Sequence, residues 1–120
     1  MRLLAIAVCF SLGAAALFGQ AATGTISGTV TDPAGAVVAN AQVEVRNTET
    51  NVPYPTVTTD AGVYTVLRLP PGPYNVTVSA PGFKKLVRGG LAVDAGQVLP
   101  LDLMLEVGSA SESVTVTSNE

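Results

Sequence analysis

Residues 60–83, with the sequence DAGVYTVLRLPPGPYNVTVSAPGF, constrain the fold of this chain more than any other stretch. Apolar and polar residues alternate from Tyr64 and again from Tyr74. This period of two is typical of a strand with one buried face and one solvated face. Between the two runs, the prolines of residues 70–72 cannot donate backbone hydrogen bonds and the glycine tolerates a positive φ. We therefore predict two strands joined by a stiff corner, with both tyrosines in the core.

Further alternating runs recur along the chain at a spacing of about ten residues. They cover residues 25–31, 41–46, 56–59, 91–93 and 99–106. Lys84, Lys85 and Arg88 surround two apolar residues, which indicates a solvated edge strand whose charges discourage pairing. We expect the two glycines after it, 89–90, to turn the chain. The complete pattern predicts an all-β protein, a seven-stranded antiparallel β-sandwich.

The connections between these runs have turn chemistry. Asp32 precedes Pro33, and we expect its carboxylate to bond the backbone of its own turn rather than a calcium ion. Residues 47–55 are polar and contain two prolines, which predicts a loop or a frayed edge. Tyr54 lies in this segment and is the candidate ligand contact, since a tyrosine ring can stack on a sugar, and Phe83 is the other aromatic residue available for such a contact. Partial burial at the base of the loop is the alternative.

Composition excludes several classes of function. Only 12% of the residues are charged, the formal net charge is −3, and the six basic residues are scattered, so a nucleic-acid surface is not expected. The chain has no histidine and one cysteine, Cys9. An ordinary zinc site, a Ser-His-Asp triad and a Cys-His pair therefore cannot be built. We predict no catalytic residue, no metal, no cofactor and no enzyme activity.

Residues 1–22 have the pattern of an export signal. Arg2 begins the chain, an apolar run extends to Phe18, and small residues at Gly19 and Ala21 suit cleavage near Ala21. A membrane anchor is the alternative. Cleavage there would leave an exported protein without cysteine, held together by its core.

Five motifs together resemble the carboxypeptidase regulatory-like domain. They are GTVTDPAG at 28–35, AQVEV at 41–45, DAGVY at 60–64, LPPGPY at 69–74 and APGF at 80–83. The resemblance implies a transthyretin-like (prealbumin-like) Greek-key sandwich over about residues 24–106. It also implies a non-catalytic module, because such domains accompany metallocarboxypeptidases or precede outer-membrane TonB-dependent transporters, and are grouped with carbohydrate-binding-like folds.

The tail has a different character from the preceding domain. Residues 108–111 are small and predict a flexible linker. The following segment resembles a TonB box, a short extended segment that pairs with TonB, and its residues are Glu112, Ser113, Val114, Thr115, Val116 and Thr117. An additional strand on the edge of the domain, or an interdomain linker, is the alternative. We divide the chain into a signal peptide (1–22), a sandwich domain (23–107) and a linker with the TonB-box-like strand (108–120).

The resulting hypothesis is an exported module whose tail pairs with a TonB-type energy-coupling protein, next to an outer-membrane barrel. A carbohydrate-binding or cell-surface adhesive module and a structural spacer are the alternatives.

Overall fold

The computed structural model describes residues 22–109 and 111–117, and within them every regular element is a β-strand. The strands are β1 (Gly24–Thr31), β2 (Gln42–Asn47), β3 (Pro53–Val57), β4 (Val63–Leu69), β5 (Gly72–Ser79), β6 (Lys85–Val93), β7 (Val98–Pro100), β8 (Leu103–Met104) and β9 (Ser113–Thr117). The predicted signal peptide falls almost entirely on residues 1–21, outside the described part. Within the described part, no helix is long and apolar enough to cross a membrane.

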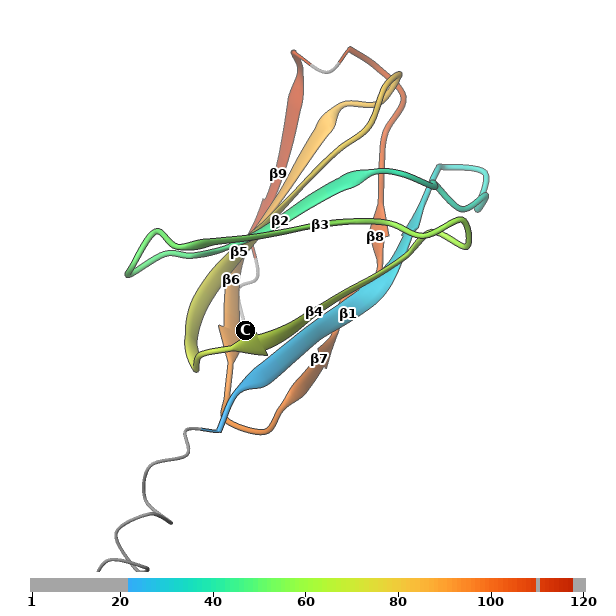
Figure 1. The fold of residues 1–120 in the computed structure, drawn as a ribbon. Coiled ribbons are helices and arrows are strands. Elements are labelled where there is room, and N and C mark those ends of the chain that lie inside the picture. The colour runs from blue at the N-terminus through green and yellow to red at the C-terminus, as the bar shows by residue number, and fades with distance from the viewer. Residues whose placement is uncertain (1–21, 110, 118–120) are drawn as a thin grey trace, which may run out of the picture.

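The strands form two sheets that face each other (Figure 1). The first sheet has the order β4-β1-β7, with β8 also paired to β1, and the second has the order β3-β2-β5-β6-β9. The predicted all-β sandwich is thus confirmed. Nine strands are present in the described residues rather than seven. The pairings β1–β7, β1–β8 and β6–β9 are parallel, so the sandwich is not purely antiparallel.

The proline corner at residues 70–71 links the two sheets. β4 belongs to the first sheet and β5 to the second, so the two strands of the central stretch do not pair with each other. Tyr64 is 1% exposed and Tyr74 is 0% exposed, which confirms that both tyrosines lie in the core. A stiff corner without hydrogen-bond donors suits this crossing, because neither proline could have joined a ladder.

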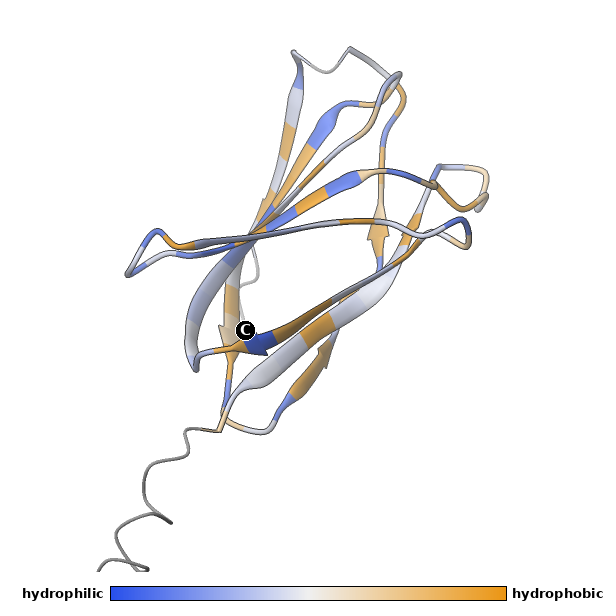
Figure 2. Ribbon diagram, in the orientation of Figure 1, coloured by the Kyte–Doolittle hydropathy of each residue, from blue (hydrophilic) through white to orange (hydrophobic). Residues whose placement is uncertain are grey.

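The core fills the space between the sheets with the inward residues of nearly every strand. Figure 2 shows the corresponding alternation of apolar and polar residues along the strands. The largest fully buried side chains are Tyr64, Tyr74, Ile26, Leu69, Leu105, Val30, Val43, Val45, Val76, Val78 and Val93. Burying one such aliphatic side chain stabilises the fold by roughly 1.5–3 kcal/mol relative to its exposed state.

The last predicted core strand, 99–106, is divided in two. β7 and β8 both run parallel to β1, and Leu101 and Asp102 lie between them, outside both strands. The Leu101 N–H donates to the Ser27 carbonyl oxygen at 2.7 Å, and the Thr29 N–H donates to Asp102 Oδ1 at 2.9 Å. A Cβ on Gly28 would lie 1.8 Å from the Leu101 carbonyl oxygen, so this approach requires glycine.

The segment 84–93 also differs from expectation. It is one strand, β6, and the glycines at 89–90 lie inside it rather than in a turn. The register with β5 shifts at this point, because Tyr74 pairs with Leu91 while Val76 pairs with Arg88. The glycines therefore form a β-bulge, with Gly90 at a φ of 71°. β6 is not an edge strand, since β9 pairs with its outer side.

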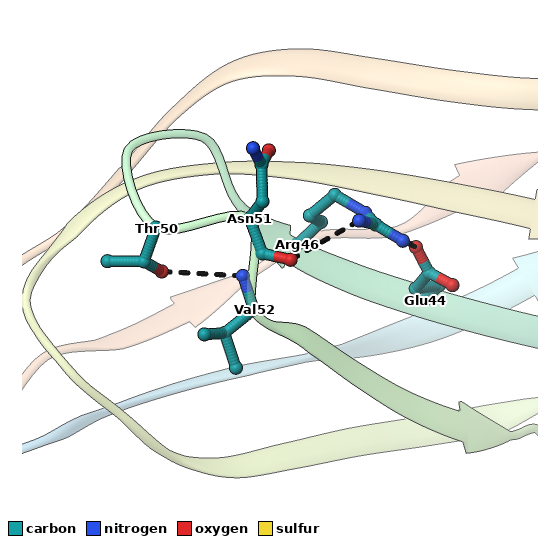
Figure 3. Close-up of polar contacts among 5 residues, drawn as sticks. All are labelled: Glu44, Arg46, Thr50, Asn51 and Val52. Carbon is teal, nitrogen blue, oxygen red and sulfur yellow. Dashed lines mark hydrogen bonds and ion pairs between the residues drawn. The ribbon is translucent and has the colours of Figure 1, made fainter.

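The polar segment between β2 and β3 is a short turn followed by an edge strand. The prolines at 53 and 55 lie within β3, at the edge of the second sheet, as the frayed-edge alternative predicted. Figure 3 shows Arg46 between Glu44 and the backbone of Asn51: its Nε donates to Glu44 Oε1 at 2.9 Å and its Nη1 to the Asn51 carbonyl at 3.2 Å. Asp32 Oδ1 accepts from Ala34 N and Ala36 N, which confirms its predicted turn role.

Candidate functional site

The tail segment that resembles a TonB box forms β9, which pairs in parallel with β6. The register runs from Lys85 opposite Ser113 to Gly89 opposite Thr117. Of the two alternatives for the tail, the structure thus has the additional strand on the edge of the domain. Glu112 precedes β9, and its carbonyl accepts a hydrogen bond of 2.9 Å from Lys85 N.

The described part of the predicted linker is tied to the domain rather than free. The Gly108 N–H donates to the Gly82 carbonyl at 3.1 Å, and Phe83 forms a bridge with Val107. Lys84 reinforces this contact, with its Nζ 3.7 Å from Glu106 Oε2 and 3.5 Å from Glu112 Oε2. Exposed ion pairs contribute only about 0.2–1 kcal/mol each, so these two pairs add little to the stability of the fold.

The alternation of β9 separates its two faces. Val114 packs partly buried against the core, and Val116, in the same phase, is 39% exposed. The Lys85 N–H donates to the Glu112 carbonyl, so the main-chain carbonyl of Glu112 points toward β6. In a parallel ladder every second residue of a strand bonds to the same neighbour, so the main-chain groups of Val114 and Val116 also point toward β6. The N–H and C=O groups of Ser113, Thr115 and Thr117 therefore point to the open edge of the sheet.

The other sheet edges in the described residues carry features that discourage strand addition. β3 has prolines at 53 and 55, and β7 ends at Pro100. β4 bulges where Leu67 and Arg68 lie opposite Thr25, with Arg68 at a φ of 60°. β8 has two residues. β9, with the sequence SVTVT, has no proline, charge or bulge, so its edge is open to a further strand.

A groove of about 290 Å³ lies beside β9, between the β6–β9 side of the second sheet and β8 of the first. Its lining residues are Lys84, Leu86, Arg88, Asp102, Leu103, Met104, Glu106, Val114 and Val116. Met104 on one side is 58% exposed and Val116 on the other is 39% exposed. Sequence reasoning did not identify this groove. Arg88 lies two residues after the buried Leu86, so its side chain is on the inward face of β6. A cation on an inward face was the sequence signal that could have indicated the groove.

Tyr64 lies near the charged end of this groove. Burial raises the pKa of its hydroxyl above the usual value, and the negative charge of Asp102 raises this pKa further, while Arg88 lowers it. The neutral hydroxyl donates to the Leu101 carbonyl oxygen at 2.5 Å. Tyr64 is thus a structural hydrogen-bond donor to the segment between β7 and β8.

Tyr54, the predicted ligand contact, lies on β3 with its ring partly buried against the core. Its ring centroid is 6.3 Å from that of Tyr74, in an edge-to-face arrangement at 60°. This position matches the alternative of partial burial. Stacking of Tyr54 on a sugar stays an untested prediction.

A second, shallow hollow of about 390 Å³ lies on the outer face of the second sheet, lined by Gln42, Glu44, Arg46, Thr77, Ser79 and Lys85. The lining is polar and contains no aromatic ring on which a sugar could stack. Within the described residues, no group of three or more acidic, histidine or cysteine side chains could hold a metal ion.

The sequence matches the model of one protein family, described as the carboxypeptidase regulatory-like domain, over residues 25–106. No relative matched among curated proteins.

Solved structures share the fold. A Bacteroides uniformis protein provisionally described as carbohydrate-binding has 18% identity and a TM-score of 0.57, over 70% of this chain and 41% of that one. The minor pilin GBS52 of Streptococcus agalactiae has 10% identity and a TM-score of 0.59, over 75% and 47%. Catechol 1,2-dioxygenase of Acinetobacter radioresistens has 16% identity and a TM-score of 0.56, over 82% and 58%. At such identities these likenesses show the fold alone, and the chain spans less than two thirds of each.

Proposed function

The chain belongs to the carboxypeptidase regulatory-like domain family, and we propose that it is a non-catalytic, exported module whose terminal strand β9 pairs with a TonB-type protein by strand addition. In this function the domain acts as the N-terminal extension of an outer-membrane transporter. The observation that carries the proposal is the edge position of β9, whose Ser113, Thr115 and Thr117 main-chain groups point away from β6, with no further strand paired there among the described residues.

Strand addition takes its affinity from main-chain hydrogen bonds, so a short Val/Thr segment is sufficient if its edge is accessible. The sandwich supports such an edge because β6 already holds β9 extended in register. A partner then does not have to order the segment, which reduces the conformational entropy that association costs. The module thereby presents a preformed strand.

The non-catalytic part of the proposal follows from chemistry. The chain lacks histidine, and the charged side chains that line the groove are two cations and two carboxylates. The proposed location is the periplasm or the outer membrane, since residues 1–22 have the pattern of an export signal that would be cleaved near Ala21.

The test titrates a labelled C-terminal domain of TonB with the purified exported protein. The variants are a chain lacking residues 111–120, Thr115→Pro and Thr115→Val. Thr115→Pro removes one N–H from the open edge and leaves the groups that face β6, so we expect binding to weaken at least about tenfold. Thr115→Val keeps the N–H and should bind like the unmodified protein.

Two results would contradict this function. One is equal binding by the unmodified protein and the chain lacking residues 111–120. The other is no binding by either chain, with β9 still paired to β6 in hydrogen-exchange measurements.

A carbohydrate-binding or adhesive module is the second candidate, favoured by the fold shared with the Bacteroides uniformis protein and by the polar hollow on the second sheet. Retention of the exported protein on immobilised polysaccharides, and its loss in Arg46→Ala, would support this candidate. A protein without retention, whose melting temperature no polysaccharide shifts, would instead correspond to a structural spacer.

A further inference from the structure

Arg88 is a half-buried cation in the groove beside β9. Its Nε is buried and has no hydrogen-bond partner, and no ion pair involves its guanidinium among the described residues. Lys84, the other cation of the groove, already contacts Glu106 and Glu112. Asp102, also in the groove, accepts a hydrogen bond from the Thr29 N–H. Among the described residues, Arg88 is thus the basic group of this groove that has no acidic partner.

The rim of the groove is apolar and exposed. Met104 on β8 and Val116 on β9 lie on opposite sides of it, with Leu86 and Leu103 also in the lining. Because side chains alternate between the two faces of a strand, every second residue of a strand added beyond β9 would point toward this groove. An added strand would therefore place a row of side chains between Met104 and Val116.

We propose that the groove selects the partner strand, receiving apolar side chains at alternate positions and one aspartate or glutamate that pairs with Arg88. This inference rests on the proposed function, since the strand that brings the acid is the one that pairs with the open edge of β9. Arginine can bind a carboxylate through two parallel N–H···O bonds, which orient the acid as well as attract it. The pair would set the register of the added strand, because only one position would place the acid at Arg88.

The probe is a capped nine-residue peptide of alternating Val and Thr with Lys at both ends, in which the central Val is Glu. A matched peptide has Gln at that position. Binding to the exported protein is measured by fluorescence anisotropy, and the location by nuclear magnetic resonance shifts of β9 and β6 amides. We expect the Glu peptide to bind about tenfold more tightly than the Gln peptide, as for one charge-assisted hydrogen bond.

Arg88→Gln should remove this tenfold difference. Lys85→Gln removes the same charge from an exposed neighbour on the outer face of β6, and should preserve it. Equal binding of the two peptides to the unmodified protein would overturn the inference, as would equal losses in Arg88→Gln and Lys85→Gln.

Failure of the proposed function has a different signature. In that case neither peptide binds, or both bind Thr115→Pro as well as the unmodified protein. Failure of the inference alone leaves both peptides bound in a manner sensitive to Thr115→Pro, with no dependence on the Glu or on Arg88.

Discussion

The hydroxyl of Tyr64 donates a hydrogen bond to the carbonyl oxygen of Leu101, across 37 positions of sequence. The donor lies on β4 and the acceptor between β7 and β8, on opposite sides of β1 in the first sheet. This bond therefore connects β4 to the segment in which the last strand is interrupted.

Tyr64→Phe should lower the free energy of unfolding by about 1–3 kcal/mol, because the buried Leu101 carbonyl loses its donor. Urea denaturation of the protein measures the change. The control is Tyr54→Phe, whose hydroxyl has no hydrogen-bond partner among the described residues, and a change within about 0.5 kcal/mol is expected there. Equal losses in both variants would contradict a specific role for the Tyr64 bond.

The same tyrosine gives a pH dependence. Its pKa is raised in the folded protein, so the stability that the neutral hydroxyl contributes is complete below the unfolded pKa of about 10 and is lost as the pH rises above it. The stability difference between the unmodified protein and Tyr64→Phe should therefore narrow above about pH 10, by at most about 1.4 kcal/mol per pH unit. Urea denaturation across that pH range measures it, and a difference that stays constant would contradict the burial of a neutral hydroxyl.

Gly28→Ala should be among the most damaging small substitutions. The added Cβ would meet the Leu101 carbonyl oxygen at 1.8 Å, and because that atom is backbone, β1 and the segment at Leu101 would have to separate. A loss of about 3 kcal/mol or more is expected. Gly96→Ala is the control, since no atom lies within 4 Å there and its φ of 74° alone should cost about 1 kcal/mol. Similar unfolding midpoints for the two variants would refute the steric explanation.

Arg68→Gly should stabilise the protein by a few tenths to about 1 kcal/mol. Arg68 holds a φ of 60° in the bulge of β4, a conformation that glycine adopts without the clash of a Cβ. Arg68→Ala keeps the Cβ and should bring no gain. Thermal unfolding distinguishes the two. A gain in both variants would attribute the effect to the arginine side chain instead of its backbone conformation.

Local features of the fold could be predicted because they depend on neighbouring residues. The alternation at 74–79 placed Tyr74 in the core, and Asp32 was assigned to its turn from the adjacent Pro33. The divided strand at 99–106 was not predictable, because four leucines in one phase look like a single strand. The interruption depends on the approach of Leu101 to Gly28, which is distant in sequence.

The candidate site was predicted in part. The segment 112–117 was identified by its pattern, but its parallel pairing with β6 and the adjacent groove were not. Lys84 and Lys85 suggested an edge strand, and β9 covers that edge instead. A charge pattern indicates that a strand can be exposed to solvent. Which strand pairs with it depends on the path of segments that are distant in sequence.

The amino-acid sequence by itself determined the approximate position of most strands, the alternation that buries one face of each, and that histidine-dependent chemistry is absent. Each of these depends on composition or on contacts within a few residues. Only the tertiary structure decided that the proline corner at 70–71 crosses between sheets, that β9 is the edge strand of the second sheet, and that Arg88 lies in a groove with Met104 and Val116. Strand pairing is made by hydrogen bonds between distant segments, and a period of two is compatible with many such pairings.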